Sequence, residues 1–288
     1  MNKIWINGRF FELNKAKISV FDRGFMYGDG AFETMRSYAG VIFKMDEHQK
    51  RLFTSLKILK IKAPYTKTYL KGIIYDCLKV NKLQSAYIKI IITRGEGRFG
   101  IIHKDAFMPN VVIVAKAFDG YPDWMFDCGI SSLLTGIHNE CSVLAGIKSL
   151  NYLPFIMARF KAKGEGFDDA ILTNTKGYIT EGATSNIFLV KLGNVITPSL
   201  ASGILPGITR DVIIYIARAL KIHVKEKAVS RKELLSADEV FFTNSLAEVL
   251  PVTRVGSKWI GDGEVGPITK LLRISYQKQV IKAVTCQI

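Results

Sequence analysis

Gly146-Ile147-Lys148-Ser149-Leu150-Asn151-Tyr152 is the stretch from which the rest of the chain can be interpreted. It places a lysine among apolar neighbours, at the point where a helical pattern of apolar residues opens. Apolar surroundings disfavour the charged form of an amine, and only the uncharged amine can attack a carbonyl carbon. Lys148 is therefore a candidate for covalent catalysis, although an isolated lysine near the start of a helix is usually an ordinary surface residue.

Two later stretches supply complementary groups. Tyr178-Ile179-Thr180-Glu181-Gly182 places a carboxylate just after a short strand, and Thr184-Ser185-Asn186 follow it. Leu205-Pro206-Gly207-Ile208-Thr209 leads into an amphipathic helix, whose free N–H groups and positive dipole end favour a phosphate. Each stretch also has an ordinary interpretation, a turn in the first case and a Pro-Gly turn with a threonine cap in the second.

Together the three stretches indicate one cofactor. An amine, a carboxylate that keeps a ring nitrogen protonated and a phosphate site are what a pyridoxal 5'-phosphate (PLP) enzyme needs. Arg51, in a predicted helix, is a further phosphate candidate because a guanidinium pairs well with that anion. Thr243-Asn244-Ser245, at the end of a predicted strand, offers additional polar contacts.

Size and composition are those of a folded protein. The chain has 288 residues, 48% of them hydrophobic and 23% charged, which is enough for a large core and two domains. Its four cysteines form no Cys-x-x-Cys pair and do not cluster with the four histidines, so we expect no metal site and no disulfide framework. No signal pattern and no apolar run of transmembrane length is present, which predicts a cytoplasmic protein without membrane contact.

The net charge of +15 is the feature most easily misinterpreted. Lysines are scattered singly over nearly every segment, and no compact basic block is interleaved with aromatic residues. This pattern favours solvated helix faces over a nucleic-acid surface. We expect no nucleic-acid partner, and some attraction of anionic substrates and cofactor.

The first 118 residues predict a small α+β domain. Asn7-Gly8 is a hairpin turn signal between two short strands. Asp46 and Gln49 have the spacing of a capping box at the start of a helix. The remaining predicted elements are a strand at 31–38 that turns at Ala39-Gly40, a helix around 70–77, and strands at 86–93 and 110–117.

Residues 119–123 break the periodicity and are the predicted linker to a second domain at 124–288. This larger domain combines helices with many strands. The predicted helices pass through Leu153, Ile156, Met157 and Phe160, span 208–220 and begin near 267; the predicted strands lie at 169–173, 178–180, 186–191, 222–229, 239–243 and 249–254.

Taken together, these segments resemble the fold-type IV PLP enzymes, the class IV aminotransferases. That group includes branched-chain aminotransferases, D-amino acid aminotransferases and aminodeoxychorismate lyases. The matching motifs occur in family order over about residues 2–275: Asp22-Arg23-Gly24, Tyr27-Gly28-Asp29-Gly30-Ala31-Phe32-Glu33, His48-Gln49-Lys50-Arg51-Leu52, Lys148-Ser149-Leu150-Asn151-Tyr152, Thr180-Glu181-Gly182 with Ser185-Asn186, Pro206-Gly207-Ile208-Thr209-Arg210, and Glu248-Val249-Leu250-Pro251-Val252.

The resemblance implies an α/β fold with a small N-terminal domain and a larger pseudo-barrel C-terminal domain, with PLP between them, in a homodimer. It implies that Lys148 is the catalytic residue, forming the imine and moving the substrate proton. The implied cofactor-binding residues are Lys148, Arg51, Tyr152, Glu181, Ser185, Asn186, Gly207, Ile208, Thr209 and Ser245. The substrate-binding candidates are Tyr27, Phe32, Arg36, Lys89, Arg98 and Leu246, among which Arg98 or Arg36 is our first choice for the substrate carboxylate.

Several positions depart from the branched-chain pattern. The commonest bacterial branched-chain enzymes carry Tyr-Ile-Arg where this chain has Tyr87-Ile88-Lys89, so their carboxylate-binding arginine is missing. Thr93-Arg94-Gly95-Glu96-Gly97-Arg98 looks more like the D-amino acid enzymes and the lyases. The histidine that the D-amino acid enzymes place two positions later is Gly100 here.

Other positions also resemble different subgroups of the family. Thr34 and Thr243-Asn244-Ser245-Leu246 resemble the lyases, whereas Tyr152 resembles enzymes that transaminate aliphatic amino acids. We predict a PLP-dependent aminotransferase that acts on a branched-chain or other aliphatic amino acid, L or D, and on a 2-oxo acid. The alternative is 4-amino-4-deoxychorismate lyase, which releases pyruvate and 4-aminobenzoate. A third interpretation, a basic protein without catalysis, predicts salt-sensitive nucleic-acid binding.

Overall fold

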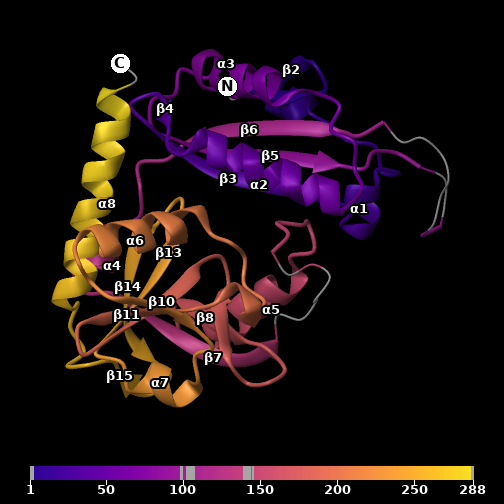
Figure 1. The fold of residues 1–288 in the computed structure, drawn as a ribbon. Helices are drawn as coiled ribbons and strands as arrows, with labels where there is room; N and C mark the ends of the chain where they lie inside the picture. Colours follow the sequence, from indigo (N-terminus) through magenta and orange to yellow (C-terminus); the bar gives the residue numbers. More distant parts are fainter. Residues whose placement is uncertain (1–2, 98–99, 102–107, 139–143, 145, 287–288) are drawn as a thin grey trace. The chain divides into compact units, whose positions relative to one another are not determined.

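The computed structural model describes residues 3–97, 100–101, 108–138, 144 and 146–286. The chain forms two compact units (Figure 1). The first unit comprises Met1–Asp119, Ile147–Asn151 and Ala283–Ile288, and the second comprises Gly120–Gly146 and Tyr152–Lys282. The change of unit at Asp119–Gly120 falls at the predicted linker, but the segment around Lys148 belongs to the first unit rather than to the second.

The first unit is built on a six-stranded sheet in the order β2-β1-β6-β5-β3-β4. Its strands are β1 (Lys3–Ile6), β2 (Arg9–Glu12), β3 (Gly30–Tyr38), β4 (Val41–Ile42), β5 (Ala86–Thr93) and β6 (Val111–Ala117). Its helices are η1 (Leu13–Lys15), α1 (Arg23–Tyr27), α2 (Met45–Ile58) and α3 (Lys67–Val80).

The hairpin predicted at Asn7-Gly8 is confirmed. Both residues have positive φ, 46° for Asn7 and 96° for Gly8, as a two-residue turn between β1 and β2 requires. The strand predicted at 31–38 is confirmed as well, as β3. Ala31 and Met35 pack with α2 and α3 in one buried apolar cluster, whereas Phe32 belongs to the other face of the sheet.

The capping box predicted for α2 is wrong. The helix begins at Met45, after Lys44 with φ of 57°, and no side chain caps it. Asp46 instead accepts a hydrogen bond from Lys71 at 2.7 Å, and the amide nitrogen of Gln49 donates to the backbone oxygen of Lys67 at 2.9 Å. The left-handed turn at Lys44 starts the helix two residues before the predicted position, so both predicted capping side chains join α2 to α3.

The second unit is built on a nine-stranded sheet in the order β12-β11-β10-β13-β14-β7-β8-β9, with β15 beside β14. Its strands are β7 (Ile130–His138), β8 (Asp169–Thr173), β9 (Ile179–Gly182), β10 (Asn186–Lys191), β11 (Asn194–Pro198), β12 (Val224–Lys227), β13 (Glu239–Asn244), β14 (Glu248–Val255) and β15 (Lys258–Trp259). Its helices are α4 (Trp124–Asp127), α5 (Leu153–Gly164), η2 (Leu200–Ser202), α6 (Ile208–Ala219), α7 (Arg231–Leu235) and most of α8 (Pro267–Thr285).

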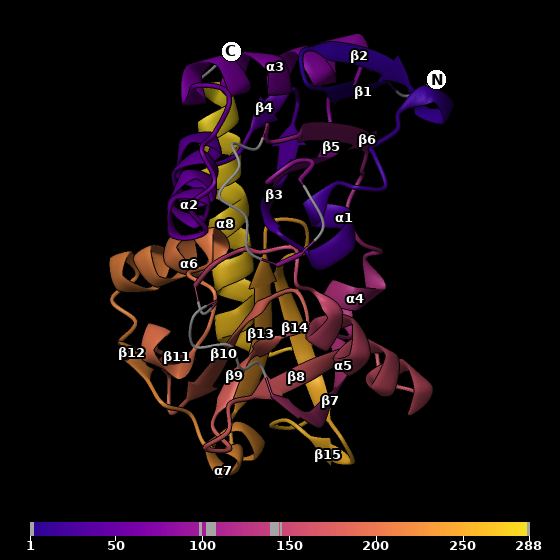
Figure 2. The ribbon, with the colours of Figure 1, turned by 90° about the vertical axis from the view of Figure 1, so that its right-hand side faces the viewer.

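The pseudo-barrel predicted for this part of the chain is confirmed. Strand β9, at the end of the order, pairs with β10 through Glu181 and Asn186, which closes six strands on themselves. Figure 2 shows β13, β14, β7 and β8 side by side in this barrel. Two candidate site residues therefore form the pair that closes it.

One carboxylate organises the start of α8. The side-chain oxygens of Glu239, on β13, accept hydrogen bonds from the backbone N–H groups of Ile268 and Thr269 and from the hydroxyl of Thr269. The first N–H groups of a helix have no partner within the helix, so this cap attaches α8 to the barrel. Among the described residues, no helix is both long and apolar enough to pass through a lipid bilayer.

Candidate active site

Lys148 lies in an extended segment, so the helical start predicted there is wrong. The segment forms an isolated antiparallel bridge with the edge of β3, where the N–H of Phe32 donates to the carbonyl of Lys148 and the N–H of Leu150 to that of Gly30, both at 3.0 Å. The helix α5 begins only at Leu153, because Pro154 has no N–H to donate and is accommodated in a first turn alone.

The amine of Lys148 lies against an aromatic ring in the first unit. Its Nζ is 4.6 Å from the ring centroid of Phe32, and the Nζ of Lys89 is 4.5 Å from the same centroid. Burial lowers the pKa of Lys89. The structure thus brings together three of the predicted residues, one catalytic and two on the substrate side.

Arg36 follows Phe32 along the same face of β3. Its guanidinium carbon is 4.5 Å from the ring centroid of Tyr38 and 5.0 Å from that of Phe118. Tyr87 is its cross-strand partner on β5, and burial raises the pKa of this tyrosine. Arg36 is therefore held among aromatic rings, at a position separate from the Phe32 ring that Lys148 and Lys89 contact.

Arg51 is paired with a carboxylate that we did not predict as a site residue. Its Nε and Nη2 donate to the two carboxylate oxygens of Glu33, at 2.6 and 2.8 Å. The ring nitrogen Nδ1 of His48 lies 2.8 Å from Glu33 as well. The sequence held a signal for this pair, since Glu33 occupies a helix-facing position of β3 and His48 and Arg51 are three residues apart on α2.

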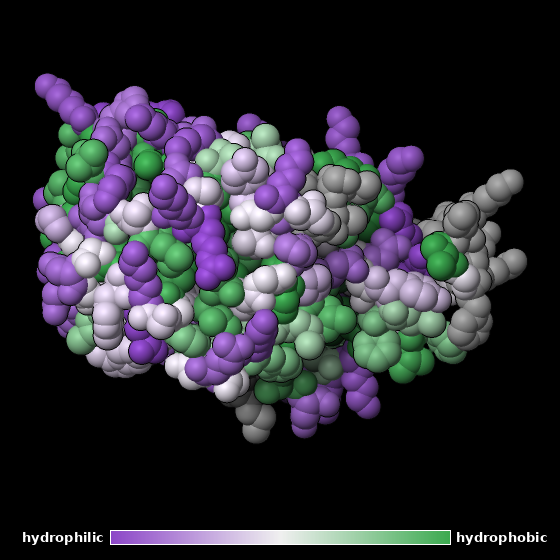
Figure 3. Space-filling view, turned by 90° about the horizontal axis from the view of Figure 1, so that it is seen from below, coloured by the Kyte–Doolittle hydropathy of each residue, from purple (hydrophilic) through white to green (hydrophobic). Residues whose placement is uncertain are grey.

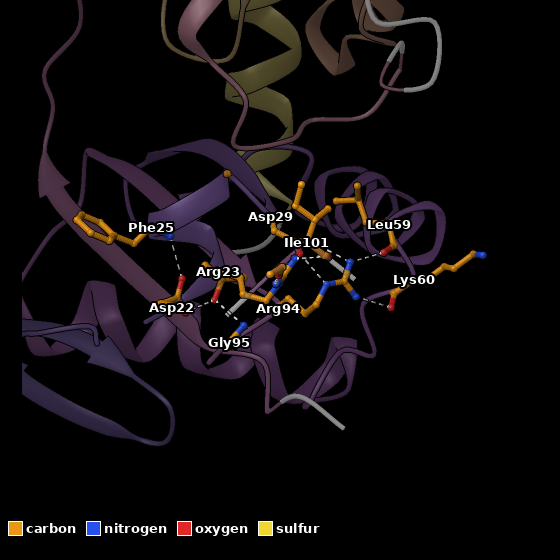
Figure 4. A network of polar contacts seen from close by, with 12 residues as sticks. Asp22, Arg23, Phe25, Asp29, Leu59, Lys60, Arg94, Gly95 and Ile101 are labelled. Carbon is orange, nitrogen blue, oxygen red and sulfur yellow. Dashed lines mark hydrogen bonds and ion pairs between the residues drawn. The ribbon is translucent and has the colours of Figure 1, made fainter. Parts of the chain in front are cut away.

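Tyr27 ends α1 and is partly exposed, with the guanidinium of Arg23 stacked on its ring at 4.9 Å. Arg23 and Arg94 both donate to the carboxylate of Asp29, at 2.9 and 2.8 Å (Figure 4). Burial raises the pKa of Asp29, but the hydrogen bonds and charges of the two arginines outweigh it, so the pKa is lowered. This network fixes the segment beside Tyr27.

The same two arginines anchor neighbouring backbone. Arg23 donates to the carbonyl oxygens of Gly100 and Ile101, and Arg94 donates to those of Leu59 and Lys60. Arg98, our first choice with Arg36 for the substrate carboxylate, lies outside the described residues.

In the second unit, the carboxylate of Glu181 contacts the segment that leads into helix α6. Glu181 is buried, and its Oε2 accepts a hydrogen bond from the N–H of Leu205 at 3.2 Å. The amide nitrogen of Asn186 donates to the carbonyl of the same Leu205 at 2.9 Å. Gly207 precedes α6, and an added Cβ there would lie 1.8 Å from Oδ1 of Asn186, so only glycine fits. The predicted motifs around Glu181, Asn186 and Gly207 are thus brought together.

Three buried hydroxyl groups belong to the segments that contain Asn186 and Gly207 or pair with them. Ser185, Thr209 and Thr243 are all buried, and Thr243 is the cross-strand partner of Asn186. Within the part of the chain that the structure describes, Ser185 Oγ and Thr243 Oγ1 have no hydrogen-bond partner. Buried hydroxyls without partners are costly, which favours a polar ligand at this place. Ile208 begins α6 with its backbone N–H at the positive end of the helix.

The remaining predicted residues also belong to the second unit. Ser245 and Leu246 form the turn between β13 and β14, where Asn244 Oδ1 accepts hydrogen bonds from the N–H groups of Leu246 and Ala247 at 2.9 and 2.7 Å. Tyr152 precedes α5, with its ring centroid 4.9 Å from that of Phe155.

The residues of both units fit PLP by their chemistry. The first unit offers an amine and a guanidinium, and the second offers a buried carboxylate, a glycine-headed helix start and hydroxyls without partners. Among the described residues, no three histidine, cysteine, aspartate or glutamate side chains are grouped as metal ligands.

Comparison with known proteins points in the same direction. Residues 30–255 match the family model described as amino-transferase class IV. A putative branched-chain-amino-acid aminotransferase of Methanocaldococcus jannaschii is 39% identical over 277 residues, covering 96% of this chain and 95% of the relative. A D-alanine aminotransferase of Staphylococcus haemolyticus is 34% identical over 282 residues, covering 97% and 98%.

Solved structures share the fold. The Escherichia coli branched-chain amino acid aminotransferase superimposes with a TM-score of 0.92 at 33% identity, covering 96% of this chain and 94% of the other. The branched-chain amino acid aminotransferase of Thermobaculum terrenum, in its PLP form, gives a TM-score of 0.87 at 27% identity, covering 98% and 94%.

Proposed function

Because this chain belongs to the class IV aminotransferase family, we propose that its amino donor is a branched-chain aliphatic L-amino acid and its acceptor a 2-oxo acid. The general activity follows from the family and the relatives, so the protein is a PLP-dependent aminotransferase. The relatives compared are aminotransferases, and the lyase alternative is not favoured.

The contact of Lys148 with Phe32 carries the choice of donor. The amine lies over an aromatic ring whose cross-strand neighbour is Ile91, so apolar groups lie on the surface beside it together with the ammonium group of Lys89. Such a surface favours an aliphatic side chain over a charged one, because apolar groups gain free energy when they are removed from water together. Relatives named as branched-chain enzymes at 39% and 34% identity support the same choice.

Lys89 is the cation that we now place nearest the substrate carboxylate. It lies over the Phe32 ring together with Lys148, whereas Arg36 is stacked between Tyr38 and Phe118. An ammonium group held in partly buried surroundings binds a carboxylate more strongly than one in water.

The cofactor-binding roles are proposed residue by residue. Arg51 and the start of α6, with Ile208 and Thr209, would hold the phosphate. Glu181 would keep the ring nitrogen protonated, and Tyr152 would contact the ring oxygen. The hydroxyls of Ser185 and Ser245 and the amide of Asn186 would complete the polar contacts around the cofactor.

The chain's own residues then account for the proton transfers. When bound, PLP supplies an electron-withdrawing ring that stabilises negative charge left at the substrate α-carbon. Lys148 Nζ would remove the proton from that α-carbon and return it to the cofactor carbon that is bonded to the amino nitrogen, which is general base and then general acid catalysis by one amine. The ring of Phe32 keeps water from one side of the amine.

The experiment that tests the donor is an absorbance spectrum of the purified enzyme with single amino acids. We expect L-leucine, L-isoleucine and L-valine to bleach the visible band of the bound cofactor, and D-alanine to leave it unchanged. Bleaching by D-amino acids alone would contradict the proposed stereochemistry. Release of pyruvate from aminodeoxychorismate without any 2-oxo acid would instead establish the lyase.

We also propose that the protein forms a homodimer through α5. Four apolar side chains at helical spacing on this helix are exposed: Leu153 (66%), Ile156 (42%), Met157 (50%) and Phe160 (68%). A continuous exposed apolar stripe of this kind is typical of a protein interface. Light scattering after gel filtration should give twice the mass of 32.2 kDa, and Phe160→Glu should give the monomer. A monomeric wild-type protein would refute this proposal.

We also propose that the protein is located in the cytoplasm. Among the described residues Cys77, Cys128 and Cys286 are free thiols, which suits a reducing compartment. Fractionation of the source cells, followed by immunodetection, tests it. Recovery of the protein outside the cytoplasmic fraction would contradict it.

A further inference from the structure

Glu33 is a fully buried carboxylate on the apolar side of the first sheet. Its relative exposure is 0%, and its neighbours on that face of β3 are Ala31 and Met35. Its cross-strand partner on β5 is Ile90. An aliphatic residue would fill this position without desolvating a charge, so core packing alone does not account for a glutamate here.

The carboxylate is ionised, and two side chains, Arg51 and His48, hold it. Burial raises the pKa of Glu33, but the charge and hydrogen bonds of Arg51 and the hydrogen bond of His48 outweigh it and lower the pKa to about 2. Burial lowers the pKa of His48, so its ring is neutral near pH 7 and donates from Nδ1 to Glu33. Glu33 and Arg51 therefore form a neutral pair inside the unit.

This pair lies where two elements meet the catalytic segment. On α2, Arg51 is one turn from Ser55, whose hydroxyl accepts a hydrogen bond from the backbone N–H of Lys148 at 3.3 Å. On β3, Glu33 follows Phe32, whose N–H bonds to the carbonyl of Lys148 and whose ring lies beside the amine. The elements that carry the pair are thus the same two that hold Lys148.

We propose that Glu33 is a positioning residue, which fixes the guanidinium of Arg51 by its Nε–Nη2 edge so that the Nη1 side meets the cofactor phosphate. His48 would hold Glu33 in place from the other side. This inference rests on the proposed role of Arg51 as a phosphate ligand, and it adds the group that orients that ligand.

Removal of the Glu33 charge should change the affinity for PLP in the direction opposite to the one that net charge alone predicts. Glu33 cancels the charge of Arg51, so removing the carboxylate charge makes the surroundings more positive. If net charge decided phosphate binding, Glu33→Gln would bind PLP more tightly. If orientation decides it, the same substitution weakens binding, because the planar fork of arginine binds a phosphate well only in a defined direction.

The test compares binding of PLP with binding of pyridoxal, which lacks the phosphate. The holoenzyme is stripped of cofactor and titrated with each, for wild type, Glu33→Gln, Arg51→Gln and the double variant. We expect Glu33→Gln to weaken PLP binding about tenfold and pyridoxal binding little, because one charge-assisted phosphate contact is lost. Arg51→Gln should lose at least as much, and the double variant no more than Arg51→Gln alone.

Three results would overturn the proposal. These are unchanged or tighter binding of PLP by Glu33→Gln, equal losses for PLP and pyridoxal, and additive losses in the double variant. Should Arg51→Gln bind both ligands as wild type does, the phosphate role of Arg51 itself is wrong. The donor proposal is tested separately, since cofactor affinity does not depend on which amino acid the enzyme uses.

Glu33→Asp keeps the experiment informative if Glu33→Gln does not fold. It keeps the charge and shortens the side chain by one methylene. The carboxylate then no longer reaches the guanidinium of Arg51 in the same geometry, while the pair stays neutral. We expect Glu33→Asp also to weaken PLP selectively over pyridoxal. Binding of PLP by Glu33→Asp at wild-type strength would refute the positioning role.

Discussion

At the scale of single residues, substitutions of the two lysines beside Phe32 should have different effects, one on the chemical step and the other on substrate binding. Lys148→Ala should abolish the visible band and lower kcat by on the order of 10³-fold or more, because the amine that we propose moves the proton is removed. Lys89→Ala should keep the band and raise KM for the amino acid. Visible spectra and steady-state kinetics of the two variants check this. An equal loss of colour in both would contradict the assignment.

Gly207 is the residue at which the smallest change should have a large effect. An added Cβ would lie 1.8 Å from Oδ1 of Asn186, so Gly207→Ala must displace either that amide or the start of α6. We expect a loss of about 1–3 kcal/mol of unfolding free energy and weaker PLP binding. Gly164→Ala is the matched control, since nothing lies within 4 Å of its added Cβ. Denaturant titration should leave the control near wild type.

Glu33 should also make the free energy of unfolding decrease at acid pH. Its pKa in the folded protein is about 2 against an ordinary value of 4.5, so the unfolded state binds the proton more tightly. The stabilisation from this group is complete above about pH 4.5 and is lost as the pH falls toward 2, by about 3 kcal/mol. Unfolding curves of wild type and Glu33→Gln between pH 2 and 6 test this, and parallel curves would contradict it.

At the scale of elements, α8 depends on a carboxylate from another element. Glu239→Gln weakens the cap that accepts from Ile268 and Thr269, and we expect it to cost about 1–3 kcal/mol of unfolding free energy. Glu264 is exposed and close by in the chain, so Glu264→Gln should stay within about 0.5 kcal/mol of wild type. Thermal unfolding followed by circular dichroism compares them. Equal melting temperatures would contradict the capping role.

Elements with a clear period or turn signal could be predicted from the sequence, and elements defined by distant partners could not. The Asn7-Gly8 hairpin and the strand at 31–38 follow from local preference, and both were confirmed. Strand β7 was not predicted, because its irregular burial reflects its place in the barrel rather than a regular alternation. The predicted start of α2 was wrong, because Lys44 adopts a left-handed conformation that lysine seldom prefers.

The site shows the same division. Lys148, Glu181 and Gly207 could be proposed from the sequence because their neighbours in the chain carry part of the signal, an apolar run or a helix start. Glu33 and His48 could not, because their contacts with each other and with Arg51 exist only where β3 and α2 pack together. A buried carboxylate at an apolar position was the one local clue.

At the scale of the whole molecule, the scattered charge has a visible counterpart. Hydrophilic side chains are spread among hydrophobic ones over the face in Figure 3, without one continuous hydrophilic block. On this face, hydrophilic residues are therefore dispersed and not gathered into one patch, as the singly scattered lysines of the sequence predict.

The course of the chain has a consequence for any attempt to divide the protein. It leaves the first unit after Asp119, returns to it for Ile147–Asn151 only, and leaves again. A cut after Asp119 would therefore yield one fragment with the edge of β3 but no Lys148, and another with Lys148 but no edge to hold its segment. We expect neither fragment alone to bind the cofactor as an imine, and fragment complementation would have to rebuild the bridge between this segment and β3.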